Sequence, residues 1–217
     1  HYFGDREIYG EQDDLLRYQF FCRAIVEMLK GGEWAPDILH LNDWHTAPLA
    51  FALRNLAWGN PALRGVASVF TIHNLRYRGP DEFNDFLSQA IYYSDIVTTV
   101  SPTHAHELRT AAGGFGLHDA FVAMRERFVG IINGIDNADW NPANDPFIAY
   151  NYSRTKLSPK KQNKLALQRI FGLPERPGTP VIGMSARMVA QKGLDLILGS
   201  PRFLSLDAQF IFLGQGE

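Results

Sequence analysis

Short apolar segments alternate with amphipathic segments along this chain of 217 residues. Apolar runs rich in β-branched and aromatic residues predict strands over residues 38–41, 66–72, 96–100, 129–132, 180–184 and 209–213. Helical spacing and helix-start signals predict helices over residues 13–29, 46–58, 83–93, 158–171 and 193–198, with another that begins at Ser101-Pro102. This alternation predicts an α/β fold with parallel sheets and helices on both sheet faces.

The crossing between two sets of these elements is expected within residues 129–142. An apolar run there breaks at Asn133-Gly134 and ends at Trp140-Asn141-Pro142. A run of this kind predicts a strand that leads into a turn. We interpret the stretch as the connection between two α/β lobes, with a cleft beside it. From this stretch alone, an ordinary surface hairpin or loop is an equally good interpretation.

Local signals within the first set predict several details. The apolar face of the helix over residues 13–29 comprises Leu15, Tyr18, Cys22, Ile25 and Leu29. Cys22 is the only cysteine, so we expect a buried thiol in a reducing, intracellular setting. Thr46 and Ser101 are predicted to cap helices, because their side-chain oxygens can accept hydrogen bonds from helical N–H groups. The Gly-rich residues 111–118 are predicted to form a loop.

The composition excludes several classes of partner. The chain is 46% hydrophobic and 20% charged, with a net charge of −2, which indicates no electrostatic surface for nucleic acid or an anionic membrane. No apolar run approaches the length of about 18 residues that would predict a transmembrane helix. The chain has 7 histidines, but the pairs His104-x-His106 and His40-x4-His45 lack a matching set of carboxylates or cysteines. We therefore expect no metal site.

Polar residues collect where the predicted strands end. These segments are NDWH, HN, SPTH, NGID, SARMVAQK and GQGE. Parallel sheets bind ligands outside the carboxyl ends of their strands. The sequence therefore predicts a ligand site built from these segments.

Arg187 and Lys192 flank a loop between a predicted strand and a predicted helix. Two cations near a helix start suit a phosphate or diphosphate, because the helix N–H groups also favour an anion. Arginine offers a bidentate contact and lysine a mobile point charge. The alternative is a pair of solvated surface cations. The loop matches neither a dinucleotide-binding glycine motif nor a P-loop.

His73-Asn74 and Asp43-Trp44-His45 are candidates for sugar binding. His73 and Asn74 follow a β-branched strand, and both can form directional hydrogen bonds with hydroxyl groups. Asp43 offers a carboxylate next to the flat apolar ring of Trp44, a common pairing for carbohydrate. A structural histidine at a strand end and an aspartate that caps the next helix are the alternatives.

Several motifs occur together in one order along the chain. They are HLNDWHTAPLA, TIHNLRYRG, DIVTTVSPTHAHEL, GIINGIDNADWNP, NKLALQRIFGLP and SARMVAQKGLDLIL. Together they resemble bacterial glycogen synthase and plant starch synthase, the retaining glucosyltransferases that elongate α-1,4-glucan. The resemblance runs through essentially the whole chain, and the DWH and NGID-x3-WNP segments separate it from relatives such as sucrose synthases.

The resemblance implies the GT-B fold, in which two Rossmann-like lobes enclose the active site. Residues 1–133 would form the acceptor-side lobe without its beginning, and residues 134–217 the truncated start of the nucleotide-sugar lobe. The implied donor is ADP-glucose, with UDP-glucose as an option, and the acceptor is the non-reducing 4-hydroxyl of an α-1,4-glucan. The implied enzyme uses no cofactor and no metal. It would lie in the bacterial cytoplasm or in a plant plastid.

The resemblance also assigns roles to individual residues. Arg187 and Lys192 match the catalytic pair that holds the donor diphosphate. His73 matches the catalytic histidine beside the transferred glucose, with Asn74 next to it in the motif. Asn133 matches the asparagine of NGID that lines the cleft on the donor side.

Asp43, followed by Trp44, matches the aspartate of the DWH segment at the sugar site. The chemistry agrees with these assignments as a whole. Cleavage of the glucose–phosphate bond leaves negative charge on the diphosphate, and two fixed cations stabilise that charge. No protein nucleophile is evident, which fits front-face attack by the acceptor hydroxyl through an oxocarbenium-like state.

The chain departs from the family pattern in several places. The N-terminal Lys-x-Gly-Gly loop and the C-terminal glutamate loop are absent, and the segments after Gly79 and over residues 198–207 are short. Residues 134–217 supply too few strands for a nucleotide-binding sheet. We therefore expect a central fragment that is inactive alone. The alternatives are another retaining GT-B glycosyltransferase, or a non-catalytic glucan-binding homologue.

Overall fold

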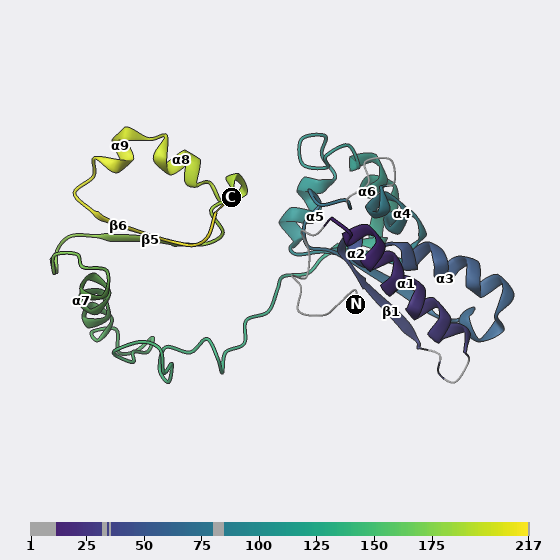
Figure 1. The fold of residues 1–217 in the computed structure, drawn as a ribbon, viewed down its shortest axis with the longest axis horizontal. Helices are drawn as coiled ribbons and strands as arrows, with labels where there is room; N and C mark the ends of the chain where they lie inside the picture. The colour runs from purple at the N-terminus through teal and green to yellow at the C-terminus, as the bar shows by residue number, and fades with distance from the viewer. Residues whose placement is uncertain (1–11, 32–33, 35, 80–84, 217) are drawn as a thin grey trace. The chain divides into compact units, whose positions relative to one another are not determined.

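The chain folds into two compact units, His1–Gly134 and Ile135–Glu217, which we call unit 1 and unit 2. The computed structural model describes residues 12–31, 34, 36–79 and 85–216 (Figure 1). A loop was expected over residues 1–12, and all of it except residue 12 lies outside the described residues. The first two residues of the helix expected over residues 83–93 also lie outside them.

Unit 1 contains a 4-stranded parallel sheet in the order β1-β2-β3-β4. Its strands are β1 (Ile38–Asn42), β2 (Ala67–Ile72), β3 (Ile96–Thr99) and β4 (Phe128–Gly130). In this register Asn42 lies opposite Thr71, and Thr71 lies opposite Thr98. The carboxyl ends of these strands therefore meet at one edge of the sheet, and the predicted α/β fold with parallel sheets is confirmed.

Helices connect the strands and cover the core of unit 1. They are α1 (Asp14–Lys30), α2 (Asp43–Thr46), α3 (Pro48–Gly59), α4 (Phe86–Tyr93), α5 (Pro102–Leu108) and α6 (His118–Met124), with the 3₁₀ turns η1 (Pro61–Leu63) and η2 (Arg125–Arg127). α1 packs beside α3, and α3 packs beside α4 (Figure 1). The main core contains Leu41, Leu49, Phe70, Ile72, Leu87, Ile91, Val97, Leu108, Phe121 and Phe128.

The core lies on one face of the unit 1 sheet, which differs from the prediction of helices on both faces. Phe70 and Ile72 are fully buried, whereas Ile38 on β1 is 58% exposed and Val129 on β4 is 41% exposed. The sequential strand order explains the difference, because successive right-handed crossovers place their helices on the same face of a sheet. This statement concerns the described residues alone.

The amphipathic stripe of α1 is confirmed. Cys22 and Leu29 are buried, and the other members of the stripe are half-buried against the core. The Cys22 thiol donates a hydrogen bond to the carbonyl of His45 at 3.3 Å, and burial raises the pKa of Cys22 to about 12. Cys22 is thus a buried thiol, as expected.

Two of the predicted details around the helix starts have different outcomes. Ser101 caps α5, because its hydroxyl oxygen accepts a hydrogen bond from the His104 N–H at 2.9 Å. Thr46 does not cap a following helix. It ends α2, and its hydroxyl bonds both the N–H and the carbonyl of Asn42, at 2.6 and 2.9 Å. The sequence prediction also missed α6, which begins at the end of the Gly-rich loop.

Unit 2 contains a parallel pair of strands, β5 (Val181–Ser185) and β6 (Gln209–Leu213). Its helices are α7 (Lys160–Ile170), α8 (Leu194–Leu198) and α9 (Pro201–Leu204), of which α9 was not predicted, and η3 (Ala190–Lys192) is a 3₁₀ turn. α7 lies on one side of the strand pair, and α8 and α9 lie on the other (Figure 1). Of the described residues in this unit, Gln168 and Ile211 are the buried ones.

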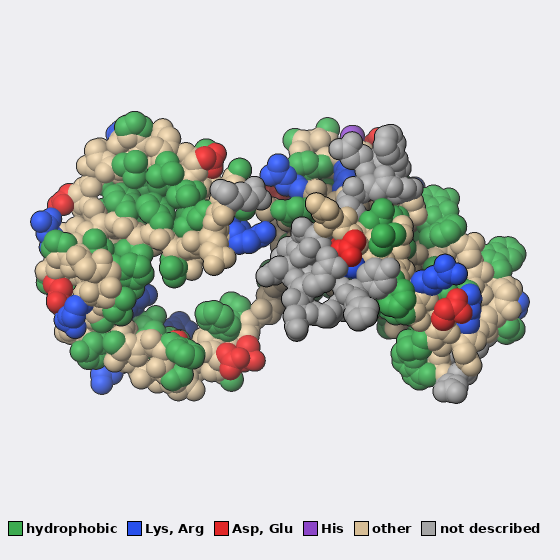
Figure 2. Space-filling model, in the orientation of Figure 1, with side chains coloured by type: hydrophobic (Ala, Val, Ile, Leu, Met, Phe, Trp, Pro, Cys, Tyr) green, Lys and Arg blue, Asp and Glu red, His purple; other side chains and the backbone are tan. Residues whose placement is uncertain are grey.

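Unit 2 leaves much apolar surface exposed. Figure 2 shows hydrophobic side chains gathered over the region of α8 and α9. The exposed apolar residues of the unit include Leu196, Leu198, Leu206 and Leu213, each at 50% or more. A two-stranded sheet buries too little apolar area to form a core of its own. No helix among the described residues is long and apolar enough to cross a membrane.

Asp95 lies just before β3 and connects it to β2 and α3 at the amino-terminal side of the unit 1 sheet. Its carboxylate accepts hydrogen bonds from the backbone N–H of Ser68 at 2.7 Å, from the Ser68 hydroxyl at 3.0 Å, and from the guanidinium of Arg54. Burial alone would raise the pKa of Asp95, but these hydrogen bonds outweigh burial and hold the pKa below its ordinary value. The charged form of Asp95 therefore stabilises the fold at neutral pH.

Replacement Asp95→Ala should lower the free energy of unfolding by about 1–2 kcal/mol, because it leaves Ser68 and Arg54 without their shared acceptor at a partly exposed site. Urea unfolding at neutral pH measures the loss. Glu27→Ala, which removes an exposed pair with Lys30, is the matched control and should unfold like the parent. Equal unfolding midpoints for both variants would contradict the assigned role of Asp95.

The ring of His45 is half-buried between two aromatic side chains. Ring centroids lie 4.5 Å from Tyr18 and 4.2 Å from Trp44. Burial lowers the pKa of His45 below 6.5, and this effect outweighs the opposing attraction of Asp43 and Asp14. The folded chain therefore keeps this ring neutral where the unfolded chain would protonate it.

Stability should accordingly fall as the pH drops below the ordinary histidine value of 6.5, because the unfolded state then binds more protons than the folded state. His45→Gln should reduce the loss of unfolding free energy as the pH drops. His106→Gln, at an exposed position of α5, should leave this loss unchanged. Urea unfolding over a pH series measures the slope. An identical slope in His45→Gln and the parent would refute the assignment.

Candidate functional site

The first group of site residues lies at the carboxyl edge of the unit 1 sheet. Asp43 follows β1 directly and has a φ of 51°, in the left-handed region. Its Oδ1 accepts hydrogen bonds from the backbone N–H groups of His73 at 2.8 Å and Asn74 at 3.4 Å. The structure therefore brings together Asp43, His73 and Asn74, which the sequence placed 30 residues apart in two motifs.

His73 is exposed and lies one residue beyond the end of β2. Its ring Nε2 lies 3.0 Å from the side-chain Oδ1 of Asn42, the last residue of β1. Sequence reasoning named the aspartate and tryptophan of the NDWH segment and passed over Asn42. The available signal was its position at a strand end, directly before Asp43.

Asn74 and Trp44 have local structural roles. The side-chain Oδ1 of Asn74 accepts a hydrogen bond from the Arg76 N–H at 3.1 Å and so closes a turn. Trp44 is only 7% exposed and belongs to the main core, where its ring meets Tyr18 edge-on at 5.2 Å. The expectation that Trp44 offers a flat surface to a sugar is therefore not supported, because α2 turns the ring inward.

Asn133 lies in the extended segment after β4 and is exposed. It forms no hydrogen bond with any residue that the structure describes, so its side chain is available to a ligand. The neighbouring Gly134 has open space where a Cβ would lie, and its φ is outside the left-handed region. Any residue could adopt this conformation, so the structure does not require glycine at the expected crossing between the lobes.

The second group lies in unit 2, in the loop that follows β5. Arg187 and Lys192 are both exposed, and neither side chain pairs with a carboxylate of the described residues. The loop between them is fixed through its backbone: the Val189 N–H donates to the Arg187 carbonyl, and the Lys192 N–H donates to the Val189 carbonyl, both at 2.9 Å. These are two free cations on an ordered loop.

The segment after β6 supports this loop. The Met188 N–H donates to the Gln215 carbonyl at 2.7 Å. A Cβ at Gly214 would lie 1.9 Å from the carbonyl oxygen of Ala186, so only glycine permits this approach. The GQG segment thus packs directly against the backbone that carries Arg187. The sequence indicated only that the GQGE segment follows a strand, and it did not predict the packing of Gly214 against Ala186.

The helix that follows the loop is present within one residue of the predicted bounds, and it is short. α8 has 5 residues, and Gly193 before it has a φ of 76°. So few aligned peptide groups give a weak dipole. The attraction of this loop for an anion therefore comes from the side chains of Arg187 and Lys192, rather than from a helix start.

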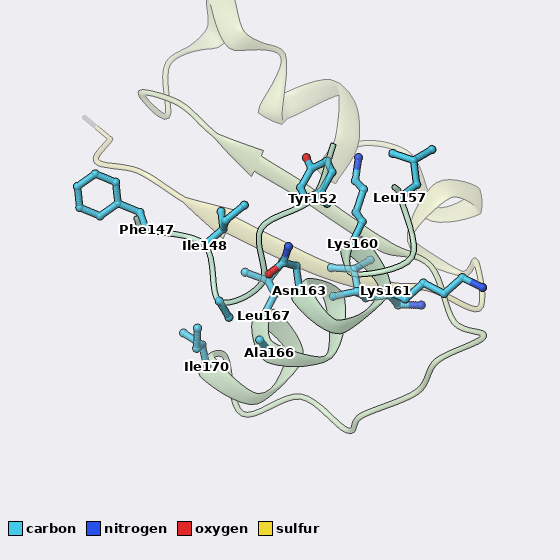
Figure 3. A pocket seen from close by; sticks show the side chains of 14 residues that line it. Phe147, Ile148, Tyr152, Leu157, Lys160, Lys161, Asn163, Ala166, Leu167 and Ile170 are labelled. Carbon is cyan, nitrogen blue, oxygen red and sulfur yellow. The ribbon is translucent and has the colours of Figure 1, made fainter. Parts of the chain in front are cut away.

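A cavity of about 670 Å³ lies elsewhere in unit 2, between α7, β5 and the connector before α7 (Figure 3). Its lining is mostly apolar, and the ammonium of Lys160 lies 5.3 Å from the ring centroid of Tyr152 at its edge. Neither Arg187 nor Lys192 lines this cavity. Among the described residues, no group of three or more His, Cys, Asp or Glu side chains is placed to hold a metal ion.

Comparisons with known proteins point to one family. Residues 1–123 match the family model of the starch synthase catalytic domain. The chain is 38% identical to glycogen synthase of Geobacillus stearothermophilus and 40% identical to that of Ligilactobacillus salivarius, and each match covers the whole chain. These matches cover 50% and 51% of the two relatives, so the chain spans about half the length of the curated relatives it matches.

A solved structure gives the same result. The catalytic domain of starch synthase IV from Arabidopsis thaliana, bound to ADP and acarbose, matches with a TM-score of 0.87 and 37% identity. The match covers 99% of this chain and 49% of that one. Together with the family model, which covers more than half of the chain, this likeness confirms the resemblance inferred from the motifs. The chain belongs to the starch synthase catalytic domain family.

Proposed function

We propose that the protein containing this chain is a glycogen or starch synthase. It transfers glucose from ADP-glucose, with retention of configuration, to the non-reducing 4-hydroxyl of an α-1,4-glucan. The observation that carries this proposal is the pair of free cations, Arg187 and Lys192, on the ordered loop after β5. The ADP and acarbose bound by the starch synthase relative support a nucleotide-sugar donor and a glucan acceptor.

Unit 2 is proposed to bind the donor diphosphate. Cleavage of the glucose–phosphate bond places negative charge on the departing diphosphate. Arg187 can contact two phosphate oxygens at once, and Lys192 can follow the charge as it develops. One preorganised interaction of this kind stabilises a transition state by about 2–4 kcal/mol. With two such cations, we propose that the reaction proceeds without a metal ion.

Unit 1 is proposed to bind the sugar. The exposed ring of His73 and the amide of Asn133 are available to glucose hydroxyls. Both hydrogen bonds to Asp43 are at Oδ1, so Oδ2 of the same carboxylate is available to a sugar hydroxyl as well. Asn74 acts through its backbone and its turn. We propose that the acceptor hydroxyl attacks from the front face, without a protein nucleophile.

Replacement of the proposed leaving-group contact tests the mechanism. Arg187→Ala in the full-length protein should lower kcat by about 100-fold or more, because the diphosphate loses its bidentate partner in the transition state. The fold should be unaffected, because the side chain is exposed. Steady-state rates of glucose transfer from ADP-glucose to glycogen provide the measurement.

Arg202→Ala is the matched control, since Arg202 is also an exposed arginine of unit 2 and lies on α9. It should retain the parental rate. Activity of Arg187→Ala within a few-fold of the parent, with a normal Arg202→Ala control, would rule out the proposed role of Arg187.

The choice of donor separates this proposal from another retaining glycosyltransferase. ADP-glucose should raise the melting temperature of the full-length protein more than UDP-glucose does at equal concentration, because tighter binding to the folded state stabilises it more. The Arg187→Ala variant should lose most of this shift. A larger shift with UDP-glucose would assign a different donor, and no shift with either would favour a non-catalytic glucan-binding protein.

A further inference from the structure

Asn42 and His73 contact each other across the end of the parallel β1–β2 pair. Asn42 lies opposite Thr71 in the register, so both lie on the same face of the sheet, and His73 follows Thr71 by two residues, one residue beyond the end of β2. The side-chain Oδ1 of Asn42 is 3.0 Å from Nε2 of the His73 ring. This distance is that of an ordinary hydrogen bond.

The contact determines which nitrogen of the ring carries the proton. An amide oxygen can only accept a hydrogen bond, so Nε2 of His73 must be the donor. In the neutral ring the other nitrogen, Nδ1, is then an acceptor. Nδ1 has no hydrogen-bond partner among the described residues, and His73 is exposed.

Both partners are fixed through their backbones. The hydroxyl of Thr46 bonds the N–H of Asn42 at 2.6 Å and its carbonyl at 2.9 Å. The carboxylate of Asp43 holds the N–H of His73 at 2.8 Å. His73 is therefore held at two points: Asp43 holds its backbone N–H, and Asn42 holds its ring Nε2.

Neighbouring polar groups on this face do not compete for the ring. His40 Nε2 lies 2.8 Å from the Thr71 hydroxyl, which lies 2.7 Å from the Thr98 hydroxyl. These side chains form a row of their own across three strands. Of the described residues, Asn42 is the one whose side chain bonds the ring of His73.

We propose that Asn42 is a positioning residue for the sugar site. It holds His73 in the Nε2-protonated form and presents Nδ1 as an acceptor to a hydroxyl of the transferred glucose. This inference rests on the proposed function, because it names a group of the same sugar site. Asn42 itself does not touch the reacting atoms.

The test compares Asn42→Ala and Asn42→Asp in the full-length protein. Nitrogen-15 NMR of labelled histidine reports the protonated ring nitrogen of His73, assigned with His73→Gln, and steady-state kinetics with ADP-glucose and glycogen report kcat and KM. Asn55→Ala is the matched control, because Asn55 is an exposed asparagine whose amide, among the described residues, bonds only the Phe51 carbonyl of its own helix.

Asn42→Ala should lose the preference for the Nε2-protonated ring and lower kcat about tenfold, with donor KM within about threefold of the parent. Asn42→Asp keeps an acceptor oxygen in place and should restore the Nε2–H signal and most of kcat at about pH 8.5, where imidazole is neutral. Asn55→Ala should match the parent in both measurements.

An unchanged ring signal in Asn42→Ala would overturn the proposal whatever the activity, and so would an unchanged kcat with an altered signal. If the parent protein transfers no glucose, the proposed function fails, and the positioning role of Asn42 in catalysis by that site fails with it. That failure is distinguishable, because the NMR comparison reports the contact between Asn42 and His73 without any turnover.

Discussion

The proposed sugar site depends on one carboxylate. Asp43 joins the end of β1 to the backbone that follows β2, through hydrogen bonds to two successive N–H groups. The residue adopts a left-handed backbone conformation to do so, which costs on the order of 1 kcal/mol and is offset by these charge-assisted hydrogen bonds. The position of His73 follows from this bridge and from the β1–β2 register. A site built in this way requires no long loop, because the parallel sheet already places both strand ends together.

The two units hold the proposed site residues by different means. In unit 1 a packed core lies beneath the sheet edge, and side-chain hydrogen bonds then set the rings and amides above it. In unit 2 few residues are buried, and the loop that carries Arg187 is held mainly by backbone hydrogen bonds and by the close approach of Gly214. A mobile point charge, the role proposed for Lys192, tolerates such support better than a ring whose tautomer must be set. The difference in support therefore matches the difference in the proposed chemistry.

Much of the fold was predictable from the sequence because apolar periodicity reports burial directly. Every predicted strand is present within one or two residues at its ends, and α1 carries its stripe where expected. The short helices α6 and α9 were missed, since four to seven residues give too few positions to show a period. Trp44 was misjudged because the NDWH segment looks polar, yet the turn into α2 directs the indole inward. Asn42 and Gly214 were overlooked because their roles arise from contacts with distant segments, which no local pattern records.

The close approach of Gly214 to Ala186 has a consequence for how this protein tolerates sequence change. A methyl group at position 214 would occupy the space of the Ala186 carbonyl, one residue before Arg187. Variation after β6 is therefore transmitted to the cation loop through the backbone, although position 214 bears no side chain and contacts no predicted ligand. A substitution scan that judged positions by chemistry alone would class Gly214 as silent. Its steric environment makes it one of the least replaceable positions in unit 2.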